Sequence, residues 1–583
     1  MSIDYREMKQ AIGLNWYRVD PNLALNMDRL LDAADRDWVE DKLRAMGELI
    51  GTTVAENAEI TDKHPAELVR WNRDGEEINQ VVHNGSALET KRLLWKHDFL
   101  HLPWSDEARA RGRSVPAPLM FAYQYLLSQA ETGMLCSIGM TTGVLRLVER
   151  YGDEATRQMF LPRLKDNDFD RGWDGSMYLT ERAGGSDLGT TETVARLVDG
   201  EWKLNGFKWF CSNVDGRAMV TLARPEGAPD GIKGLALFAL SRTLPDGTPN
   251  GLHIRRIKDK LGTRAVPTGE IDMVDATAHL LAGGGDAVDG KGINRMMEFV
   301  NESRMGVAAM GAGIMRRSFL EAAIRAWQRQ AFGKPLAEHG MVRTQLIDLQ
   351  VASEAAAAML FTAASRMPEE GQAIGTGDPL GRILVPLTKM RCTRGGIESA
   401  SAALELHGGN GYIEDWPMAR QLRDAQCHTI WEGAENVIAL DVLRTIAREH
   451  AHEALLERID RARAGADDPL LAEPVAAIDR LRGHVFEELA RLAAADRATA
   501  NLRARRFANL FADLTQVALL VEEARWQLDR GDARKAVVAH WFARTRLAAT
   551  RPAPTCDAIA MELFEPLTQY QPIDRERARR AMR

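Results

Sequence analysis

The amino-acid sequence predicts a mainly α-helical protein with one small β domain in its middle. Apolar residues repeat with helical spacing in the first 175 residues, as in 119–127 and 140–151, and again from Ile293 nearly to the end. Between 176 and 285 the pattern changes to short β-rich runs separated by turn pairs. A chain of 583 residues is also too long for one ordinary core, so we expect several domains.

We divide the chain into an N-terminal helical domain (1–175), a central β domain (176–285), a helical bundle (286–450) and a C-terminal helical extension (451–583). The runs 193–197, 201–204, 219–222 and 235–238 are expected to form antiparallel strands. The turn pairs between and after these runs are Asp199-Gly200, Asn205-Gly206, Asp246-Gly247 and Asn250-Gly251. Glycines in 283–292 indicate a flexible connector to the bundle.

Long periodic segments predict the helices that follow the connector. We expect helices over 293–330, 342–366 and 380–406, packed as a bundle, and a further helix over 432–450. Within the C-terminal extension, a break that contains Pro and Asp at 464–474 introduces a further helical block. Its predicted core stripes are Ile478, Leu481, Val485, Leu489 and Leu492, and then Leu510, Leu514, Val517 and Val521.

The composition is that of a soluble globular protein, with 45% hydrophobic and 27% charged residues. A net charge of −7 argues against a chain that is basic throughout, so any contact with nucleic acid would be local. The five cysteines are scattered and never spaced Cys-x-x-Cys, which favours a reducing cytosol and no metal site. Residues 1–30 lack a signal-peptide core, and no 18-residue uncharged span is found. We therefore expect a cytoplasmic protein with no membrane partner.

One carboxylate is a candidate base. Glu432 lies in the stretch 423–433 (RDAQCHTIWEG), past a chain reversal and ahead of an apolar run that predicts a helix. A carboxylate there can accept a proton from a substrate. Alternatively, Glu432 is an ordinary helix-start residue that is stabilised by the helix macrodipole. The residues alone leave both interpretations open.

Six motifs in a fixed order carry a family resemblance. They are 177–187 (MYLTERAGGSD), 208–212 (KWFCS), 260–264 (KLGTR), 329–333 (RQAFG), the turn Gly408-Gly409, and Glu432 within 423–433. Because these motifs occur in the same order in the acyl-CoA dehydrogenase flavoproteins, the chain resembles that family. The stretch 72–75, the long N-terminal arm and Trp431-Glu432-Gly433 resemble the AidB-like branch, which also has a C-terminal helical extension. The resemblance covers about residues 60 to 450 and implies the acyl-CoA dehydrogenase-like fold.

The resemblance implies α,β-desaturation of an acyl-CoA thioester. Glu432 would remove the α-proton, and its peptide N–H would help to hold the thioester oxygen, while FAD takes a hydride at N5. Burial against Trp431 would raise the pKa of this base toward neutrality. Some family members use another base, and Glu302 is the nearest carboxylate, but we expect it to be a surface or ion-paired residue. The implied substrate-binding residues are Ser186, Arg304, Trp431 and Gly433.

The resemblance also implies an FAD site and a homotetramer, because the 329–333 segment reaches the flavin of a neighbouring subunit in the family. Thr180 and Ser212 would offer hydroxyls to the flavin, and Arg329 would bind its diphosphate. Without the resemblance, such residues would be read as backbone-bonded strand hydroxyls and a solvated helix-end Arg. The implied FAD-binding residues are Met177, Leu179, Thr180, Gly185, Ser186, Phe210, Ser212, Arg329, Phe332, Glu405, Gly408, Gly409, Trp431, Ala434 and Asn436.

The chain departs from the common family pattern at four of these positions. Glu405 stands where Gln is usual, Trp431 where Tyr is usual, and Ala434 and Asn436 where Thr and Gln are usual. These changes are compatible with FAD binding, because the AidB-like branch has similar ones, and they put turnover and acyl-chain specificity in doubt. The electron acceptor is expected to be an electron-transfer flavoprotein or oxygen.

A second hypothesis is that the flavoprotein binds DNA or protects it from alkylation, with weak dehydrogenase activity. From Arg491 to Arg583 the extension holds 17 Lys and Arg against 11 Asp and Glu, a local balance of +6. Basic residues concentrate at Arg503, Arg505 and Arg506 and at the end of the chain, at Arg575, Arg577, Arg579, Arg580 and Arg583. The alternative is a solvated helix face or a subunit contact, because acids are interleaved with these residues.

Overall fold

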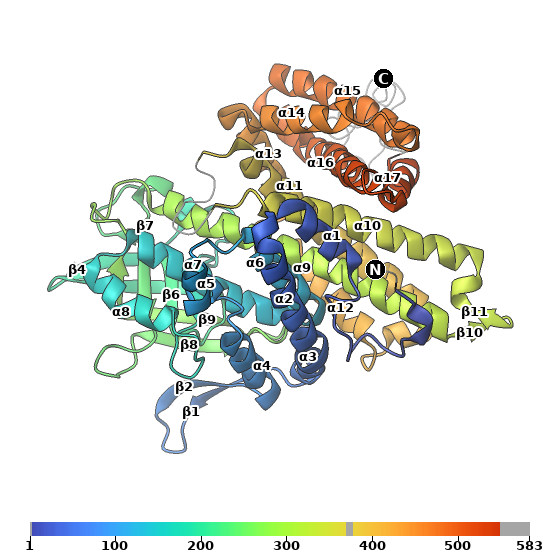
Figure 1. The fold of residues 1–583 in the computed structure, drawn as a ribbon. Coiled ribbons are helices and arrows are strands. Elements are labelled where there is room, and N and C mark those ends of the chain that lie inside the picture. Colours follow the sequence, from blue (N-terminus) through green and yellow to red (C-terminus); the bar gives the residue numbers. More distant parts are fainter. Residues whose placement is uncertain (1–2, 369–376, 548–583) are drawn as a thin grey trace, which may run out of the picture. The chain divides into compact units, whose positions relative to one another are not determined.

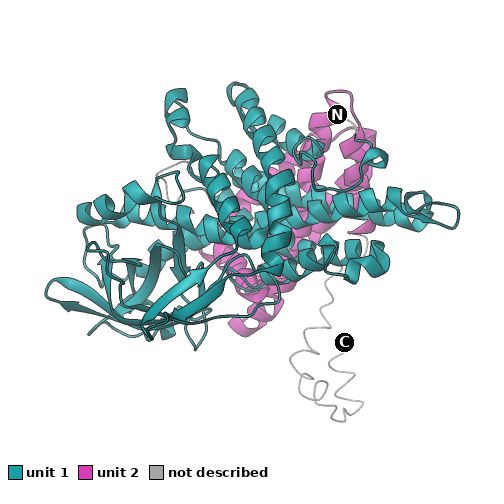
Figure 2. Ribbon diagram, turned by 90° about the horizontal axis from the view of Figure 1, so that it is seen from below, with its two compact units in different colours: residues 1–434 teal, residues 435–583 magenta. Residues whose placement is uncertain are grey.

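The computed structural model describes residues 3–368 and 377–547 (Figure 1). The chain forms two compact units, Met1–Ala434 and Glu435–Arg583 (Figure 2). The first unit holds the predicted N-terminal helices, the β domain and most of the bundle, and the second holds the later helices. The fold class is as predicted, whereas the four-domain division stays a prediction.

The N-terminal part of the first unit is mostly helical. Its helices are α1 (Pro21–Leu30), α2 (Ala33–Leu49), α3 (Ala55–Lys63), α4 (Gly85–Lys96), α5 (Asp106–Arg111), α6 (Ala117–Ala130), α7 (Thr132–Tyr151) and α8 (Glu154–Leu164). The predicted segments 119–127 and 140–151 lie within α6 and α7. Side-chain caps begin several of these helices, as at Asp153, whose carboxylate accepts from the backbone N–H of Thr156 at 2.8 Å.

The N-terminal part also contains one hairpin that the sequence did not indicate. A hairpin of β1 (Glu67–Trp71) and β2 (Glu77–Val82) extends from the helices (Figure 1). Asn72 closes its turn, because its side-chain oxygen accepts from the backbone N–H groups of Asp74 and Glu76, both at 2.9 Å. Gly75 takes the positive φ, 81°, that the turn requires.

The β domain is a seven-stranded sheet with the order β3-β6-β4-β5-β9-β7 and with β8 paired to β9. Because β6 also pairs with β7, the sheet closes on itself like a barrel. Antiparallel strands were predicted, but two pairs, β3–β6 and β4–β6, are parallel. The strands are β3 (Gly175–Tyr178), β4 (Val194–Val198), β5 (Glu201–Ser212), β6 (Ala218–Pro225), β7 (Ala236–Ser241), β8 (Leu252–Ile257) and β9 (Thr268–Leu280).

Two predicted turns in this domain had different outcomes. Asp199 and Gly200, at φ 51° and 84°, form the two-residue turn between β4 and β5, as predicted. The turn predicted at Asn205-Gly206 was wrong, since both residues lie inside β5 at a register shift. Gly206 is required there because a Cβ would lie 2.5 Å from the Thr193 hydroxyl oxygen.

The bundle contains α9 (Gly292–Gln328), α10 (Gly340–Ala364), α11 (Pro379–Leu406) and α12 (Pro417–His428). α9, α10 and α11 match the predicted ranges, except that α9 ends before the small hairpin of β10 (Gln330–Ala331) and β11 (Lys334–Pro335). No helix was predicted at α12. α9 and α11 approach closely at Gly311, where a Cβ would lie 2.4 Å from the Cys392 carbonyl oxygen. By length and composition α10 could cross a membrane, but 78% of its apolar window is buried within the protein.

The second unit is helical throughout its described residues. Its helices are α13 (Glu435–Glu449), α14 (Ala451–Ala464), α15 (Ala472–Ala494), α16 (Arg497–Leu528) and α17 (Arg534–Thr545). The predicted core stripes are buried, apart from Leu489 and Leu492, which are half-buried. The basic residues predicted at 575–583 lie outside the described residues.

Candidate functional site

Glu432 lies in a turn rather than in a helix. The helix predicted to begin at this residue begins at Glu435, and Glu432 and Gly433 have φ values of 56° and 105°. A non-glycine residue with positive φ is uncommon, because its Cβ is crowded by the backbone. The conformation sets Glu432 apart from an ordinary helix-start glutamate and indicates a turn that other parts of the fold hold in place.

Two buried cations bind the backbone of this turn. The Arg304 Nε of α9 donates to the carbonyl oxygen of Glu432 at 3.2 Å. The Lys389 Nζ of α11 donates to the carbonyl oxygens of Gly433 at 2.6 Å and Thr429 at 3.3 Å. The turn is thus held from two helices of the bundle, which the sequence did not indicate.

The electrostatics of Glu432 suit a base. Burial raises the pKa of its half-buried carboxyl to about 7, although the charges of Arg304 and Lys389 oppose the rise. A carboxylate with a pKa near neutrality is both available and strong enough to accept a proton at pH 7. Beside it, the half-buried Trp431 ring lies 6.0 Å from the ring of the fully buried His428.

The alternative carboxylate, Glu302, is ion-paired as expected. Its Oε1 lies 3.1 Å from the Arg146 Nη1 of α7, and its side chain is mostly buried. Arg304, two residues later, is engaged with Glu432 and also donates to the Asn301 side chain at 3.0 Å. Of the two carboxylates, only Glu432 lies in the strained turn, so it is the better candidate for the base.

The two predicted flavin segments of the β domain are joined by a backbone hydrogen bond. The N–H of Trp209 donates to the carbonyl oxygen of Thr180 at 2.8 Å. Gly185 closes the loop onto Thr180, because a Cβ there would lie 2.5 Å from the Thr180 hydroxyl oxygen. Ser212, at the end of β5, shares a hydrogen bond of 3.1 Å with Thr268.

Other predicted residues of these segments differ in exposure. Met177 and Leu179 are half-buried and pack against the cluster of apolar side chains that α7 and α9 share with the sheet. Phe210 is 52% exposed, and Ser186 is exposed on the loop that follows Gly185. An exposed aromatic ring beside half-buried hydroxyls provides a surface on which a planar ligand can stack.

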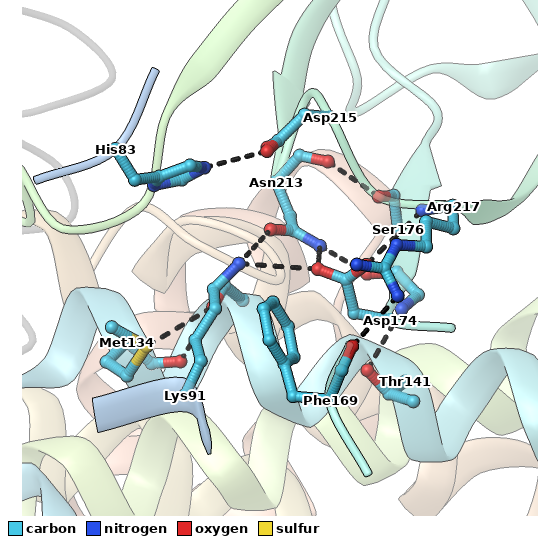
Figure 3. A network of polar contacts seen from close by, with 12 residues as sticks. His83, Lys91, Met134, Thr141, Phe169, Asp174, Ser176, Asn213, Asp215 and Arg217 are labelled. Atoms are coloured by element: carbon cyan, nitrogen blue, oxygen red, sulfur yellow. Dashed lines mark hydrogen bonds and ion pairs between the residues drawn. The ribbon is translucent and has the colours of Figure 1, made fainter. Parts of the chain in front are cut away.

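A buried polar network fixes the chain just beyond Ser212 (Figure 3). Asn213, at φ 52°, donates to Asp174 Oδ2 at 3.0 Å, and Ser176 donates to the Asn213 carbonyl oxygen at 2.7 Å. The Lys91 Nζ of α4 donates to the same Asp174 oxygen at 3.3 Å. The sequence did not indicate this network, because α4 and the sheet meet only in the folded protein.

The 260–264 motif meets the 423–433 motif. The N–H of Thr263 donates to Asp424 Oδ1 at 2.6 Å, and a Cβ at Gly262 would lie 2.6 Å from the backbone of Arg423. Burial raises the pKa of Asp424 to about 6. This contact ties the β domain to the helix that leads to Glu432, a role that the motif's sequence did not indicate.

The predicted diphosphate-binding residues also come together. Arg329 donates from Nη1 to the carbonyl oxygen of His407 at 3.4 Å, and Gly408 lies against its guanidinium with φ 64°. Gly409 and Glu405 are exposed beside this turn. Phe332, at the tip of the β10–β11 hairpin, is 97% exposed, so its ring is not buried within a single subunit. Ala434 is exposed after the Glu432 turn, and Asn436 is an exposed residue of the second unit.

The residues present fit an FAD. A guanidinium beside a glycine turn suits a diphosphate, because it offers several donors and a Cβ-free approach. Half-buried hydroxyls at Thr180 and Ser212, with the Phe210 ring nearby in sequence, offer polar and aromatic partners to a flavin ring system. The fit supports the cofactor that the motifs imply.

Gly408→Ala is expected to weaken FAD binding about tenfold. A Cβ at this position would lie 2.7 Å from the Arg329 Nη1 and would displace the guanidinium from the turn. The positive φ adds a backbone cost of about 1 kcal/mol. Flavin fluorescence during titration of apoprotein with FAD measures the change.

Gly483→Ala in α15 is the control, because a Cβ at Gly483 meets no atom within 4 Å, its φ is not positive, and the residue lies outside the predicted FAD site. Its FAD affinity should stay within about twofold of the wild type. Equal weakening in both variants would show that the Arg329 contact is unimportant.

Comparisons with known proteins identify the family of this chain. Three family models match: the AidB N-terminal domain of the adaptive response protein over residues 8–171, the acyl-CoA dehydrogenase middle domain over 176–276, and the acyl-CoA dehydrogenase C-terminal domain over 290–447. Together they span most of the chain and meet close to the boundaries of the β domain.

Two curated relatives are similar over most of their length. The putative acyl-CoA dehydrogenase AidB of Escherichia coli is 31% identical over 457 residues, which cover 76% of this chain and 80% of that protein. Acyl-CoA dehydrogenase family member 11 of Caenorhabditis elegans is 28% identical, with 77% and 73% covered.

A solved structure of C. elegans ACDH-11 in complex with C11-CoA has the same fold, with a TM-score of 0.84 at 24% identity. The match covers 94% of this chain and 95% of that chain. The chain therefore belongs to the acyl-CoA dehydrogenase family, in its AidB-like branch, and is an FAD-dependent oxidoreductase.

Proposed function

We propose that the protein desaturates an acyl-CoA thioester between its α and β carbons, with Glu432 as the base. The observation that carries the proposal is the half-buried Glu432 turn, which has a positive φ, is held by Arg304 and Lys389, and raises the pKa of the carboxyl to about 7. Glu432 takes the α-proton, the β-hydrogen leaves as a hydride, and the two carbons gain a double bond. Bound FAD supplies the hydride acceptor.

The chain's own residues support each part of this reaction. Thr180, Ser212 and Phe210 would hold the flavin ring, and Arg329 with Gly408 and Gly409 would hold the diphosphate. The turn at Glu432 and Gly433 would present a backbone N–H to the thioester oxygen, which stabilises the enolate-like charge as the proton leaves. Arg304 and Lys389 place two positive charges beside the same turn, where they favour developing negative charge.

The experiment is anaerobic reduction of the copurified flavin by saturated acyl-CoA thioesters of graded chain length. We expect a yellow protein with FAD that at least one thioester bleaches, and the chain length with the fastest bleaching defines the substrate. A folded protein without flavin, or a flavin that every thioester leaves oxidised, would contradict the proposal. Reoxidation by an electron-transfer flavoprotein, compared with reoxidation by oxygen, then identifies the acceptor.

The assembly that we propose is a homotetramer. Exposed apolar side chains gather on and after the β10–β11 hairpin and after the Gly408 turn: Phe332 at 97% exposed, Met341 at 85% and Tyr412 at 80%. Such residues are expected to be covered by another subunit. Analytical ultracentrifugation tests this expectation. The cytoplasmic location stays a prediction.

The rate is expected to depend on pH through Glu432. Only the deprotonated carboxylate accepts a proton, so the rate constant of flavin reduction should rise with pH up to about 7 and level off above it. The sign follows from the raised pKa, since a carboxyl of ordinary pKa would be active well below pH 6. Anaerobic flavin reduction measured from pH 5 to 9 tests this, and a profile flat down to pH 5 would contradict it.

The DNA-binding hypothesis has less support from the described residues. Arg503 is paired with Glu488 at 3.2 Å, and Arg505 is paired with Glu435. Acids therefore neutralise both of these arginines, which favours the alternative of a solvated face or a subunit contact. The hypothesis predicts salt-dependent binding of duplex DNA that weakens when the Arg503 cluster is replaced.

A further inference from the structure

We propose that Lys389 is a positioning residue for Glu432: its buried ammonium group holds the turn that carries the carboxylate and keeps a fixed positive charge beside it. The inference rests on the proposed role of Glu432 as the base. No motif points to Lys389, which lies in the middle of α11, 44 residues before Gly433.

The position of Lys389 is unusual for a lysine. It is fully buried, and its Nζ donates to carbonyl oxygens on both sides of Glu432, those of Thr429 and Gly433. Thr429 follows the last residue of α12, where helix carbonyls lack intrahelical donors. A buried ammonium is costly unless it is bonded, so it and the carbonyls of this turn satisfy each other.

The turn needs such support because its backbone is strained. Glu432 has a φ of 56°, which a non-glycine residue adopts stably only when the surrounding structure holds it. Lys389 donates hydrogen bonds to the carbonyl oxygens of Thr429 and Gly433, and Arg304 donates one to the Glu432 carbonyl oxygen. Hydrogen bonds from α9 and α11 therefore fix the backbone of the turn, and with it the orientation from which the Glu432 side chain extends.

Lys389 also contributes to the charge balance at Glu432. The charged groups that act on this carboxyl are Arg304 and Lys389, and both lower its pKa against the effect of burial. Of the neighbours on α7 and α12, Cys136 stays neutral because burial raises its pKa to about 12, and His428 stays neutral because burial and Lys389 lower its pKa to about 3. Removing the charge of Lys389 therefore leaves Arg304 alone to oppose burial.

The test is the pH profile of anaerobic flavin reduction in three variants. Lys389→Met should move the acid limb of the reduction rate constant up by about one pH unit and lower the plateau at least about tenfold. Lys389→Arg restores the charge and should return the limb to the wild-type position. Lys389→Gln keeps a hydrogen-bond donor for the turn but loses the charge. We expect this variant to fold better than Lys389→Met and still to show the acid limb at the higher pH.

The control is Lys535→Met, which removes another fully buried lysine, one that is paired with Glu523 in the second unit rather than with the Glu432 turn. Its acid limb should match that of the wild type. If both Lys389→Met and Lys389→Gln kept the acid limb at the wild-type pH while Glu432→Gln was inactive, the role of Lys389 would be wrong. The assignment of Glu432 as the base would remain. Full activity in Glu432→Gln would instead overturn the proposed function.

Discussion

Glu432→Gln is expected to slow reduction of the bound flavin by acyl-CoA about 10²- to 10⁴-fold while the FAD content stays unchanged. The amide is similar in size and shape but cannot accept the α-proton, so the general-base contribution is lost. The turn keeps its bonds to Arg304 and Lys389, because these cations bind backbone carbonyls and not the carboxylate. Stopped-flow absorbance of the flavin under anaerobic conditions measures the rate.

Glu302→Gln is the matched control, since Glu302 is the alternative carboxylate and is paired with Arg146. Its reduction rate should stay within a few-fold of the wild type. If Glu302→Gln abolished flavin reduction and Glu432→Gln did not, the base would lie on α9 and the assignment of Glu432 would be wrong.

Lys208→Met is expected to destabilise the β domain by about 3–5 kcal/mol. The fully buried Lys208 Nζ lies 2.7 Å from Glu181 Oε1 and donates to the Leu222 carbonyl oxygen at 3.0 Å. Removing it leaves the carboxylate of Glu181 buried without its cation. Because Glu181 directly follows Thr180, we also expect early release of FAD on heating, which flavin fluorescence reports during thermal unfolding.

Lys203→Met is the control on the same strand, because Lys203 pairs with Glu201 at 2.7 Å where Glu201 is largely exposed. Such a pair contributes less than about 1 kcal/mol. The double variant Lys208→Met with Glu181→Leu should regain part of the lost stability, since it removes the unpaired charge. Thermal unfolding of Lys208→Met at the wild-type temperature would show that this buried pair is dispensable.

Periodicity predicted α9, α10 and α11 well, because each is long and its apolar residues repeat many times. The shorter α12 was not predicted. The strands were harder to predict. β9 carries Asp272 and Asp275, which are unfavourable in a strand until partners are known. In the folded protein Asp272 accepts from Arg255 at 2.7 Å and Asp275 from the Asn205 side chain at 2.8 Å. These partners come from other strands, and no local pattern shows them.

For the site, the sequence alone determined the motifs, their order, the candidate base Glu432 and the family resemblance, since each motif consists of neighbouring residues and their order is a property of the chain itself. Only the tertiary structure decided how Glu432 is held and how strongly it binds a proton. Arg304, Lys389 and the surrounding burial come from segments distant in sequence. A carboxyl pKa depends on which charges and how much water surround the group, and both are set only when those segments pack together.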